Sequence, residues 1–375
     1  MILYISNRSK SNIGAVTHLA ALKEIFGSEN VFCVDLKPTE TARQKENYIA
    51  FGKYKSIGDR LLRWMQGNTM FISNKNIEEL IKIIEKYNIK FVFSEESFLG
   101  NFVKKLKRYS KDIKYICFYH DIGADLYRQR MKMGNFVERL ENIVAIRQEK
   151  LTVKYSDGNI VFHKADADKF KKFYGIYPDK IIPLASVVPM IDKNSCSVSF
   201  TEKKSILFVG STYYPNVLGI NWFLNRVLPQ LADDINIKIV GKIGPKLENI
   251  EDERVEIVGP VESLEKYYRE ADIVIIPLFD GGGMKVKTIE AVSYGKCIVG
   301  TEESLHGFWE EMDEDIRGKS VFQCNTPEEW IGILNALTEK EIPKFNANLY
   351  ELFLQKFSYD AMKKQLAEYL IGREK

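Results

Sequence analysis

The residues with the clearest chemical signature lie at 272–301, where the sequence reads DIVIIPLFDGGGMKVKTIEAVSYGKCIVGT. An apolar run that ends at Pro277 predicts a buried strand, three glycines at 281–283 predict a tight loop, and a helix is expected from Met284. Glycines let the backbone approach a ligand closely, and the free N–H groups at a helix N-terminus favour an anion. The segment therefore predicts an anion-binding loop.

Two lysines and a glutamate follow these glycines. Lys285 and Lys287 flank the expected first helical turn, where their ammonium groups can neutralise phosphate oxygens. Glu290 falls one turn later, and a carboxylate there can accept the hydroxyl groups of a ribose. The set predicts a nucleotide-diphosphate site. The alternative is a tight turn with solvated lysines and a Lys287–Glu290 pair. The loop matches neither the P-loop nor the GxGxxG pattern.

The elements that would position these residues alternate along the chain. Apolar runs in the first half predict strands at 1–6, 31–35, 90–94, 114–119 and 159–163, and those in the second half predict strands at 205–210, 235–241, 254–258, 272–277 and 297–300. Amphipathic stretches between them predict helices, and this alternation indicates parallel sheets with helical crossovers. We expect an α/β fold of two Rossmann-like domains whose parallel sheets face across a ligand-binding cleft.

The same pattern divides the chain. We expect an N-terminal acceptor-binding domain at 1–187, a linker at 188–204 and a C-terminal nucleotide-sugar-binding domain at 205–355. A helical segment at 356–375 can return to the N-terminal domain. The polar region 37–76 departs from the alternation and is expected to be a long loop with an inserted helix near 59–66.

The second half resembles the retaining glycosyltransferases of the GT-B fold, in the family 4 group and its relatives. The family pattern P-x-x-x-G-G-x-x-x-K-x-x-E-A-x-x-x-G-x-x-V-x-T corresponds here to Pro277, Gly282, Gly283, Lys287, Glu290, Ala291, Gly295, Val299 and Thr301. Similar segments precede it at 207–231, with a Pro-Asn pair, at 237–242 and at 255–277. The resemblance covers almost all of the C-terminal half.

The resemblance implies a metal-independent transfer of a sugar from a nucleotide-diphosphate sugar, UDP- or GDP-linked, with retention of configuration and no cofactor. It assigns donor binding to Gly210, Asn216, Lys242, Gly282, Gly283, Met284, Lys285, Lys287 and Glu290. Many members have a glutamate where this chain has Gly282, so the group that holds the transferred sugar is left open; backbone amides at 282–284 could do so. The loop 211–216 also lacks a basic residue found in many members.

The N-terminal half matches the family more weakly. The expected strand YICFYHDI ends in His120 and Asp121, and side chains at the carboxyl edge of a parallel strand face the ligand crevice. The resemblance places an active-site histidine at a similar strand end. His120 is the candidate for holding the sugar and stabilising positive charge, and Asp121 for supporting its tautomer or meeting the acceptor. Gly14 is the candidate in a loop near the sugar or acceptor. The alternative is a capping aspartate beside a packed histidine.

Several other polar residues are interpreted as structural. Glu95 and Glu96 fit the first turn of a helix capped by Ser94. His18 and His163 fit packing or surface positions, and His306 fits a loop that borders the cleft. Asp166 and Asp168 form a DxD sequence but open a helical stretch, where acidic residues are favoured. No spacing in the sequence indicates a metal site, and the prediction for a metal is none.

Charge and cysteine content suggest the surroundings in which the protein works. Residues 1–180 carry a net charge of +11 and residues 181–375 a net charge of −8. The basic half, with clusters at 104–114 and 128–132, suits a phosphate-rich acceptor or an anionic membrane surface; solvated helix faces are the alternative. No known nucleic-acid module occurs. Five cysteines without CxxC spacing, and no apparent signal peptide or membrane span, predict a cytoplasmic protein that can lie peripherally on the inner face of the membrane.

The predicted function is a glycosyltransferase of surface polysaccharide or glycoconjugate synthesis, with a glycan, lipid-linked or protein acceptor. Two alternatives remain open: a nucleotide-sugar epimerase, and a non-catalytic GT-B partner or chaperone subunit of an active transferase.

Overall fold

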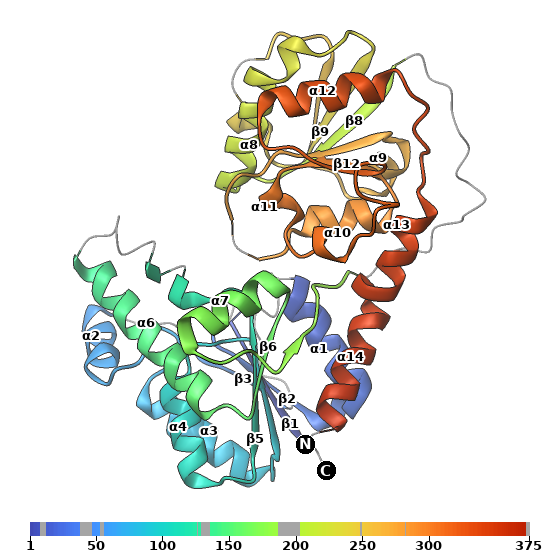
Figure 1. The fold of residues 1–375 in the computed structure, drawn as a ribbon. Coiled ribbons are helices and arrows are strands. Elements are labelled where there is room, and N and C mark those ends of the chain that lie inside the picture. The colour runs from blue at the N-terminus through green and yellow to red at the C-terminus, as the bar shows by residue number, and fades with distance from the viewer. Residues whose placement is uncertain are drawn as a thin grey trace. The chain divides into compact units, whose positions relative to one another are not determined.

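The computed structural model describes residues 1–7, 13–37, 47–52, 56–125, 127–128, 136–186, 203–247, 250–281 and 283–372. The chain divides into two compact units, each built on one parallel sheet (Figure 1). Unit 1 comprises Met1–Pro183 and Met362–Lys375, and unit 2 comprises Leu184–Ala361. None of the described helices is long and apolar enough to cross a membrane.

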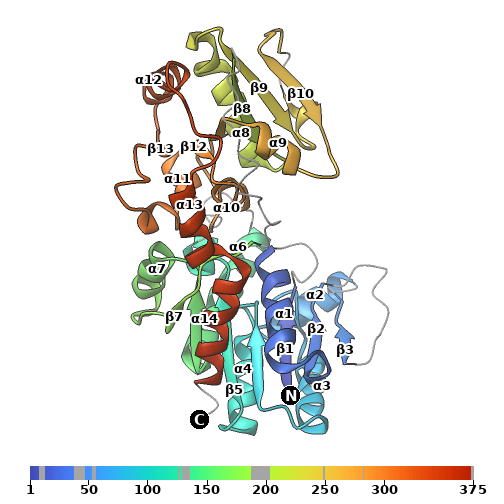
Figure 2. The same ribbon diagram turned by 90° about the vertical axis from the view of Figure 1, so that its right-hand side faces the viewer.

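The sheet of unit 1 has seven parallel strands in the order β3-β2-β1-β4-β5-β6-β7. Their bounds are β1 Ile2–Ser6, β2 Val31–Asp35, β3 Tyr48–Ala50, β4 Phe91–Ser94, β5 Lys114–Tyr119, β6 Gly158–Val161 and β7 Lys180–Ile181. The helices are α1 Ile13–Phe26, α2 Ile57–Met65, α3 Asn74–Lys86, α4 Gly100–Tyr109, α6 Phe136–Tyr155, α7 Lys164–Tyr174 and α14 Tyr359–Ile371. From Met362 onward α14 belongs to this unit, and it lies beside α1, where Lys363 pairs with Glu24 (Figure 2).

The sheet of unit 2 has six parallel strands in the order β10-β9-β8-β11-β12-β13. Their bounds are β8 Lys204–Val209, β9 Ile235–Val240, β10 Val255–Gly259, β11 Ile273–Ile276, β12 Cys297–Gly300 and β13 Val321–Gln323. The helices are α8 Tyr214–Arg226, α9 Glu265–Glu270, α10 Val286–Ser293, α11 Glu302–Leu305, α12 Pro327–Thr338 and α13 Ala347–Leu352.

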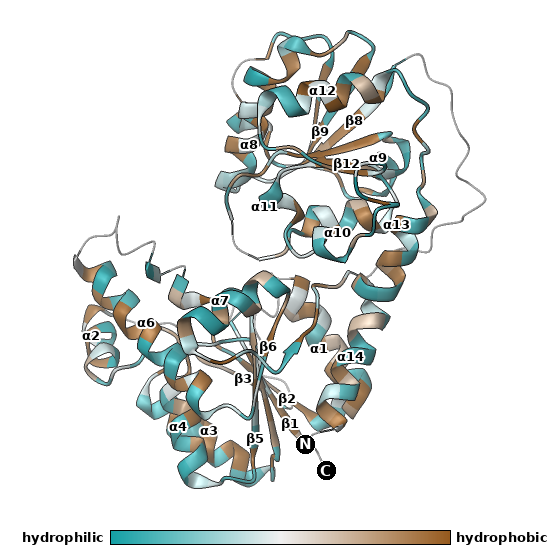
Figure 3. Ribbon diagram, in the orientation of Figure 1, coloured by the Kyte–Doolittle hydropathy of each residue, from teal (hydrophilic) through white to brown (hydrophobic). Residues whose placement is uncertain are grey.

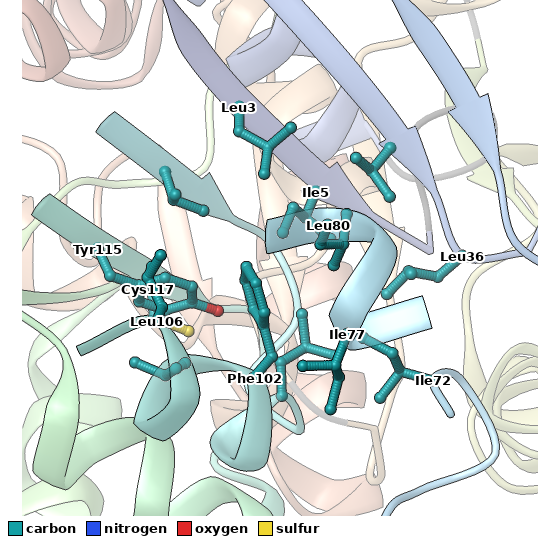
Figure 4. Close-up of a cluster of buried hydrophobic side chains, with 14 of the residues drawn as sticks. Leu3, Ile5, Leu36, Ile72, Ile77, Leu80, Phe102, Leu106, Tyr115 and Cys117 are labelled. Carbon is teal, nitrogen blue, oxygen red and sulfur yellow. The ribbon is translucent and has the colours of Figure 1, made fainter. Parts of the chain in front are cut away.

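Each unit has its own apolar core. The strands in Figure 3 are largely brown, whereas helices such as α4 and α12 carry apolar and polar faces. In unit 1 the core includes Leu3 and Ile5 of β1, Leu80 of α3 and Phe102 of α4 (Figure 4). In unit 2 strand residues such as Ile206, Ile237 and Ile275 pack with α8 and with Trp330 of α12. Continuous apolar strands result because both faces of each sheet are covered by helices.

The strand order reverses at one place in each sheet, and these places position the candidate residues. In unit 1 the reversal lies between β1 and β4, and in unit 2 it lies between β8 and β11. Ligands of open α/β sheets bind outside the carboxyl ends of the strands at such reversals, because the connecting loops leave there in opposite directions. The expected donor loop follows β11, and His120 follows β5, the neighbour of β4.

Some boundaries differ from those predicted. The division between the units falls after Pro183, before the predicted end of the N-terminal domain at residue 187, and unit 2 extends to Ala361. Most of the predicted linker, residues 188–202, lies outside the described residues. The polar region 37–76 holds β3 as well as α2, because Tyr48–Ala50 extend the sheet at its edge beside β2.

Candidate active site

The loop between β11 and α10 has the geometry of an anion-binding turn. Gly281 and Gly283 have φ angles of 124° and 65°, which residues other than glycine rarely adopt. Gly282 lies outside the described residues. The helix begins at Val286, two residues after the predicted start, and the side chain of its N-cap residue, Lys285, makes no capping hydrogen bond. These N–H groups, with the helix dipole, can hold a phosphate.

Lys287 lies at the start of α10, next to the loop that follows β8. Its Nζ donates to Asn216 Oδ1 at 2.6 Å and lies 4.6 Å from the centre of the Phe208 ring. Asn216 is held in turn by Ser211, whose carbonyl and hydroxyl oxygens accept from its amide at 3.2 Å. Burial lowers the pKa of Lys287 to about 7; Glu290 opposes this effect and Lys285 adds to it. A bound diphosphate would restore the charge of this lysine.

Lys285 has a different environment. Its ammonium group donates to the carbonyls of Gly281 and Gly283 at 3.0 and 2.9 Å and pairs with Glu303 at 2.6 Å. These bonds tie the glycine loop to α11. The arrangement favours a role in shaping the loop, and direct contact of Lys285 with a phosphate stays a prediction.

Glu290 is positioned by a tyrosine that the sequence did not single out. The Tyr268 hydroxyl donates to Glu290 Oε2 at 2.9 Å, and the Tyr268 ring stacks on Tyr294 with centroids 4.9 Å apart. Burial raises the pKa of Glu290, while Tyr268 and Lys287 lower it. One carboxylate oxygen is thus oriented by the protein, which suits the recognition of paired ribose hydroxyls. The only sequence signal for Tyr268 was its place in the segment 255–277.

Two glycines bring the ends of β8 and β9 together. A Cβ on Gly241, whose φ is 114°, would lie 2.1 Å from the carbonyl oxygen of Gly210. A side chain at Gly210 would in turn meet the Phe208 ring at 2.6 Å. Lys242 follows immediately and is exposed, and Met284 is buried. The predicted donor residues Gly210, Asn216, Gly283, Lys287 and Glu290 therefore come from the two connections at the strand reversal of unit 2.

In unit 1, His120 belongs to a buried group of three residues. His120 Nε2 lies 2.7 Å from Glu95 Oε2, and His18 Nδ1 lies 3.0 Å from Glu95 Oε1. All three side chains are at least nine-tenths buried. Burial alone would raise the pKa of Glu95, but the charge of His18 and hydrogen bonds from both histidines lower it to about 2. Glu95 is therefore an anion that orients two imidazoles.

This arrangement corrects the interpretation of Glu95 and Glu96 as residues of a helix first turn. Helix α4 begins only at Gly100, and both glutamates are buried beyond the end of β4. Ser94 does form a local cap, since its Oγ accepts from Glu96 N at 3.1 Å. His18 is likewise more than a packed histidine. The reason is tertiary: β4 lies between β1 and β5, so its end meets α1 and His120.

A second buried carboxylate holds the loop that follows His120. Glu149 accepts hydrogen bonds from the N–H groups of Gly123 and Ala124 at 3.1 and 2.8 Å and from Ser97 Oγ at 2.8 Å. Burial raises the pKa of Glu149, against these hydrogen bonds. Asp121 is partly buried beside this loop. Gly14 is buried inside α1, and its role near the sugar stays a prediction.

Two further groups bear on metal binding. Asp166 lies in the first turn of α7 and pairs with His163 at 3.1 Å, which agrees with a capping role for the DxD sequence. Donor atoms of His18, Glu95 and His120 lie within 4.8 Å of one another, so these residues could hold a metal ion. The separations of 2.7 and 3.0 Å are those of hydrogen bonds. Tetrahedral ligands about 2.0–2.2 Å from zinc would stand farther apart, so the group would have to open.

Comparisons with known proteins place these features in context. Residues 203–340 match the family model described as "Glycosyl transferases group 1". An "Uncharacterized 44.6 kDa protein in cps region" of Klebsiella pneumoniae is 26% identical over 252 residues, which span 60% of this chain and 60% of that protein. The chain thus matches less than two thirds of this relative's length.

Several solved structures share the fold. Sucrose-phosphate synthase of Thermosynechococcus elongatus superposes with a TM-score of 0.68 and 13% identity, over 99% of this chain and 98% of the other. Anabaena HepE in complex with UDP also gives 0.68, with 13% identity and 99% coverage of both chains. WaaG, a glycosyltransferase involved in lipopolysaccharide biosynthesis, gives 0.64 at 12% identity, over 98% and 99% of the two chains. The chain therefore has the GT-B fold, and the part of it that resembles the glycosyl transferases group 1 family is residues 203–340.

Proposed function

We propose that the protein is a glycosyltransferase that moves a sugar from a nucleotide-diphosphate sugar to a glycan, lipid-linked or protein acceptor. The observation that carries this proposal is the group at the strand reversal of unit 2. A half-buried lysine held by Asn216, an uncapped helix start and a glutamate oriented by Tyr268 lie on consecutive turns of one short segment. The match to the group 1 family model covers the same residues.

Each residue of this group has a part in the proposed mechanism. Glu290 accepts the ribose hydroxyls, and Lys287 with the first N–H groups of α10 binds the diphosphate. As the bond from the anomeric carbon to the diphosphate breaks, negative charge gathers on the leaving oxygen. The Lys287 ammonium stabilises that charge, a contribution of the size made by an oxyanion donor. In this proposal lysine and helix dipole neutralise the diphosphate without a metal ion.

In unit 1 we assign His120 to the transferred sugar. Glu95 holds the imidazole of His120 in one orientation. The side chain and the backbone carbonyl of His120 can then meet a sugar hydroxyl and the positive charge that develops at the anomeric carbon. We propose that the transfer retains the anomeric configuration, and the resemblance to retaining glycosyltransferases supports this. UDP is the first nucleotide to test, because HepE was solved with UDP and with UDP-glucose.

The acceptor class has indirect support. WaaG is a glycosyltransferase involved in lipopolysaccharide biosynthesis, and the Klebsiella relative is described as lying in a cps region. We therefore place this chain in the synthesis of a surface polysaccharide or glycoconjugate, acting from the cytoplasmic side.

A membrane surface is part of this proposal because α2 has exposed apolar side chains. Ile57 and Met65 are 85% and 78% exposed, and Leu61 and Leu62 are about half exposed on the same helix. Such a helix can lie in a membrane interface, and basic residues such as Lys104, Arg108 and Lys111 strengthen attraction to anionic lipid. Flotation with anionic and neutral liposomes at two salt concentrations tests this. Absence of flotation with either lipid contradicts a membrane role and favours a soluble acceptor.

The experiment that tests the function combines binding with turnover. Calorimetric titration of the full chain with UDP, GDP, dTDP and CMP identifies the nucleotide, and Lys266→Ala, at an exposed lysine, serves as the control for Lys287→Ala. Release of nucleotide from the matching sugar donor is then measured with and without EDTA. Release without metal supports the proposal. Binding without any release indicates a non-catalytic partner, and isotope exchange within the sugar indicates an epimerase.

A further inference from the structure

A cavity in unit 1 lies outside the residues assigned so far. It has a volume of about 410 Å³, and its walls include Trp64, Phe71, Phe98, Tyr127, Glu141 and Asn142. The walls come from the end of α2, the segment before α3, the connections after β4 and β5, and the first half of α6. A cavity of this size is within the range of small-ligand sites, which is roughly 300–1,000 Å³.

The cavity shares a wall with the loop that carries His120. Phe98 follows β4 three residues after Glu95, and its ring lies 2.6 Å from where a Cβ on Gly123 would stand. Phe98 and Tyr127 also pack together, with ring centroids 5.2 Å apart. The cavity therefore opens beside the carboxyl ends of β4 and β5, the edge at which Glu95 and His120 lie.

The polar groups of the cavity indicate what it can bind. Asn142 is 94% buried, lines the cavity, and its side chain makes no hydrogen bond within the described ranges of the chain. An amide that lines a cavity without a protein partner is satisfied by a ligand or by water. An alkyl chain would leave this amide unsatisfied, so the apolar tail of a lipid fits the cavity poorly.

A cation gains less there than the carboxylate of Glu141 suggests, because this wall residue already has a cationic partner. Arg60 donates to Glu141 Oε1 from Nε and Nη2 at 2.9 and 2.6 Å, and it lies 4.7 Å from the centre of the Trp64 ring. Glu141 is therefore neutralised, and the face of Trp64 is occupied by a cation. The other walls are aromatic and aliphatic, and their polar groups are Thr69, Glu138 and the Asn142 amide. This combination suits a neutral ring that has one apolar face and hydroxyl groups at its edge.

We propose that this cavity is the subsite for a hexose ring of the acceptor, so that the acceptor presents a saccharide to the enzyme. The inference rests on the proposed glycosyltransferase function, and it chooses a glycan terminus over a lipid phosphate or a protein side chain. Asn142 would bond to a ring hydroxyl, and Phe98 would contact both the ring and the loop after His120.

The test uses saturation-transfer NMR on the full chain with UDP present and with methyl α- and β-glycosides of glucose, galactose, mannose and N-acetylglucosamine as probes. At least one glycoside should bind the wild type. Asn142→Leu should weaken that binding by about tenfold, the effect of losing roughly one to two hydrogen bonds. Its melting temperature should not fall, since the substitution removes no hydrogen bond within the described residues and adds an apolar side chain to a cavity wall. Ile143→Ser, on the exposed face of α6, is the matched control and should leave glycoside binding unchanged.

Equal glycoside binding by Asn142→Leu and wild type, or no binding of any probe, would overturn the proposal. Binding of decyl phosphate that is insensitive to Asn142→Leu would assign the cavity to a lipid tail instead. UDP affinity is measured in the same samples, and it depends on residues of unit 2. Absence of UDP binding by the wild type would count against the glycosyltransferase function. Absence of glycoside binding by a wild type that binds UDP would count only against the subsite.

Discussion

Glu95 and His120 are joined by a hydrogen bond of 2.7 Å that neither residue's sequence neighbourhood reveals. The other oxygen of Glu95 lies 3.0 Å from His18, so one carboxylate orients two imidazoles. The Tyr4 hydroxyl lies 3.3 Å from the same carboxylate and donates to the carbonyl oxygen of Ala15 at 2.9 Å. Glu95 is therefore a positioning residue for the proposed sugar site, acting through His120.

The first prediction concerns the hydrogen bonds of Glu95 to the two histidines. Glu95→Gln should lower the turnover of the identified donor by roughly 10- to 100-fold, the effect typical of losing a group that orients a functional histidine. Donor affinity should stay unchanged, because the donor residues belong to unit 2. A KM and kcat measurement with a thermal melt checks both points. A rise in the donor KM with unchanged kcat would contradict a positioning role, and Glu78→Gln, at an exposed site, is the control.

Glu95 also makes the free energy of unfolding depend on pH in the acidic range. The pKa of Glu95 is about 2 in the folded protein against an ordinary 4.5, so its ionised form stabilises the fold above about pH 4.5. That stabilisation is lost as the pH falls from 4.5 towards 2. The difference in unfolding free energy between wild type and Glu95→Gln should therefore be constant at neutral pH and shrink across this window. Urea unfolding at several pH values measures it, and a difference independent of pH would contradict the low pKa.

The pKa of Lys287 predicts that donor affinity is lost as the pH rises, whereas the stabilisation by Glu95 is lost as the pH falls. Its pKa of about 7 means that it is charged below pH 7 and increasingly neutral above. Affinity for a fully ionised diphosphate diester such as UDP-glucose should fall as the pH rises through 7, with proton uptake on binding. Calorimetry in buffers of different ionisation enthalpy measures that uptake. Lys287→Met should remove the pH dependence and lower turnover by about 10²–10³-fold.

Lys285→Met separates loop shaping from phosphate binding. Because Lys285 ties the glycine loop to Glu303, its loss should weaken donor binding while the pH dependence around 7 persists through Lys287. Hydrogen exchange of residues 278–285 should also increase. If Lys285→Met abolished the pH dependence while exchange stayed unchanged, Lys285 would be the phosphate ligand instead.

Tyr268→Phe tests the ribose contact. Removing the hydroxyl frees Glu290 Oε2, so donor affinity should fall by a factor of about 3 to 10, the range expected for one hydrogen bond. Wild type should bind UDP more tightly than 2′,3′-dideoxy-UDP, and Glu290→Gln should reduce that preference. Equal binding of the two nucleotides by wild type would show that Glu290 does not meet the ribose.

The sequence alone determined most of the local structure. The apolar runs of both halves correspond to strands, because a strand covered on both faces must be apolar along its length. The glycine loop, Lys287 and Glu290 were found from a segment of 30 residues, since a strand, a turn and a helix start are local features. The β3 strand was missed because three residues at a sheet edge carry little pattern.

Only the tertiary structure decided which distant residues act together. His18, Glu95 and His120 stand on three different elements, and their contact depends on β4 lying between β1 and β5. Tyr268 of α9 reaches Glu290 of α10, and Asn216 of α8 reaches Lys287 of α10. The two lysines of one motif likewise have different partners: Lys285 connects the glycine loop to Glu303, whereas Lys287 is half-buried beside Asn216. Side-chain type and spacing determine which chemistry is available locally, whereas burial and partners, which come from strand order, determine charge state and role.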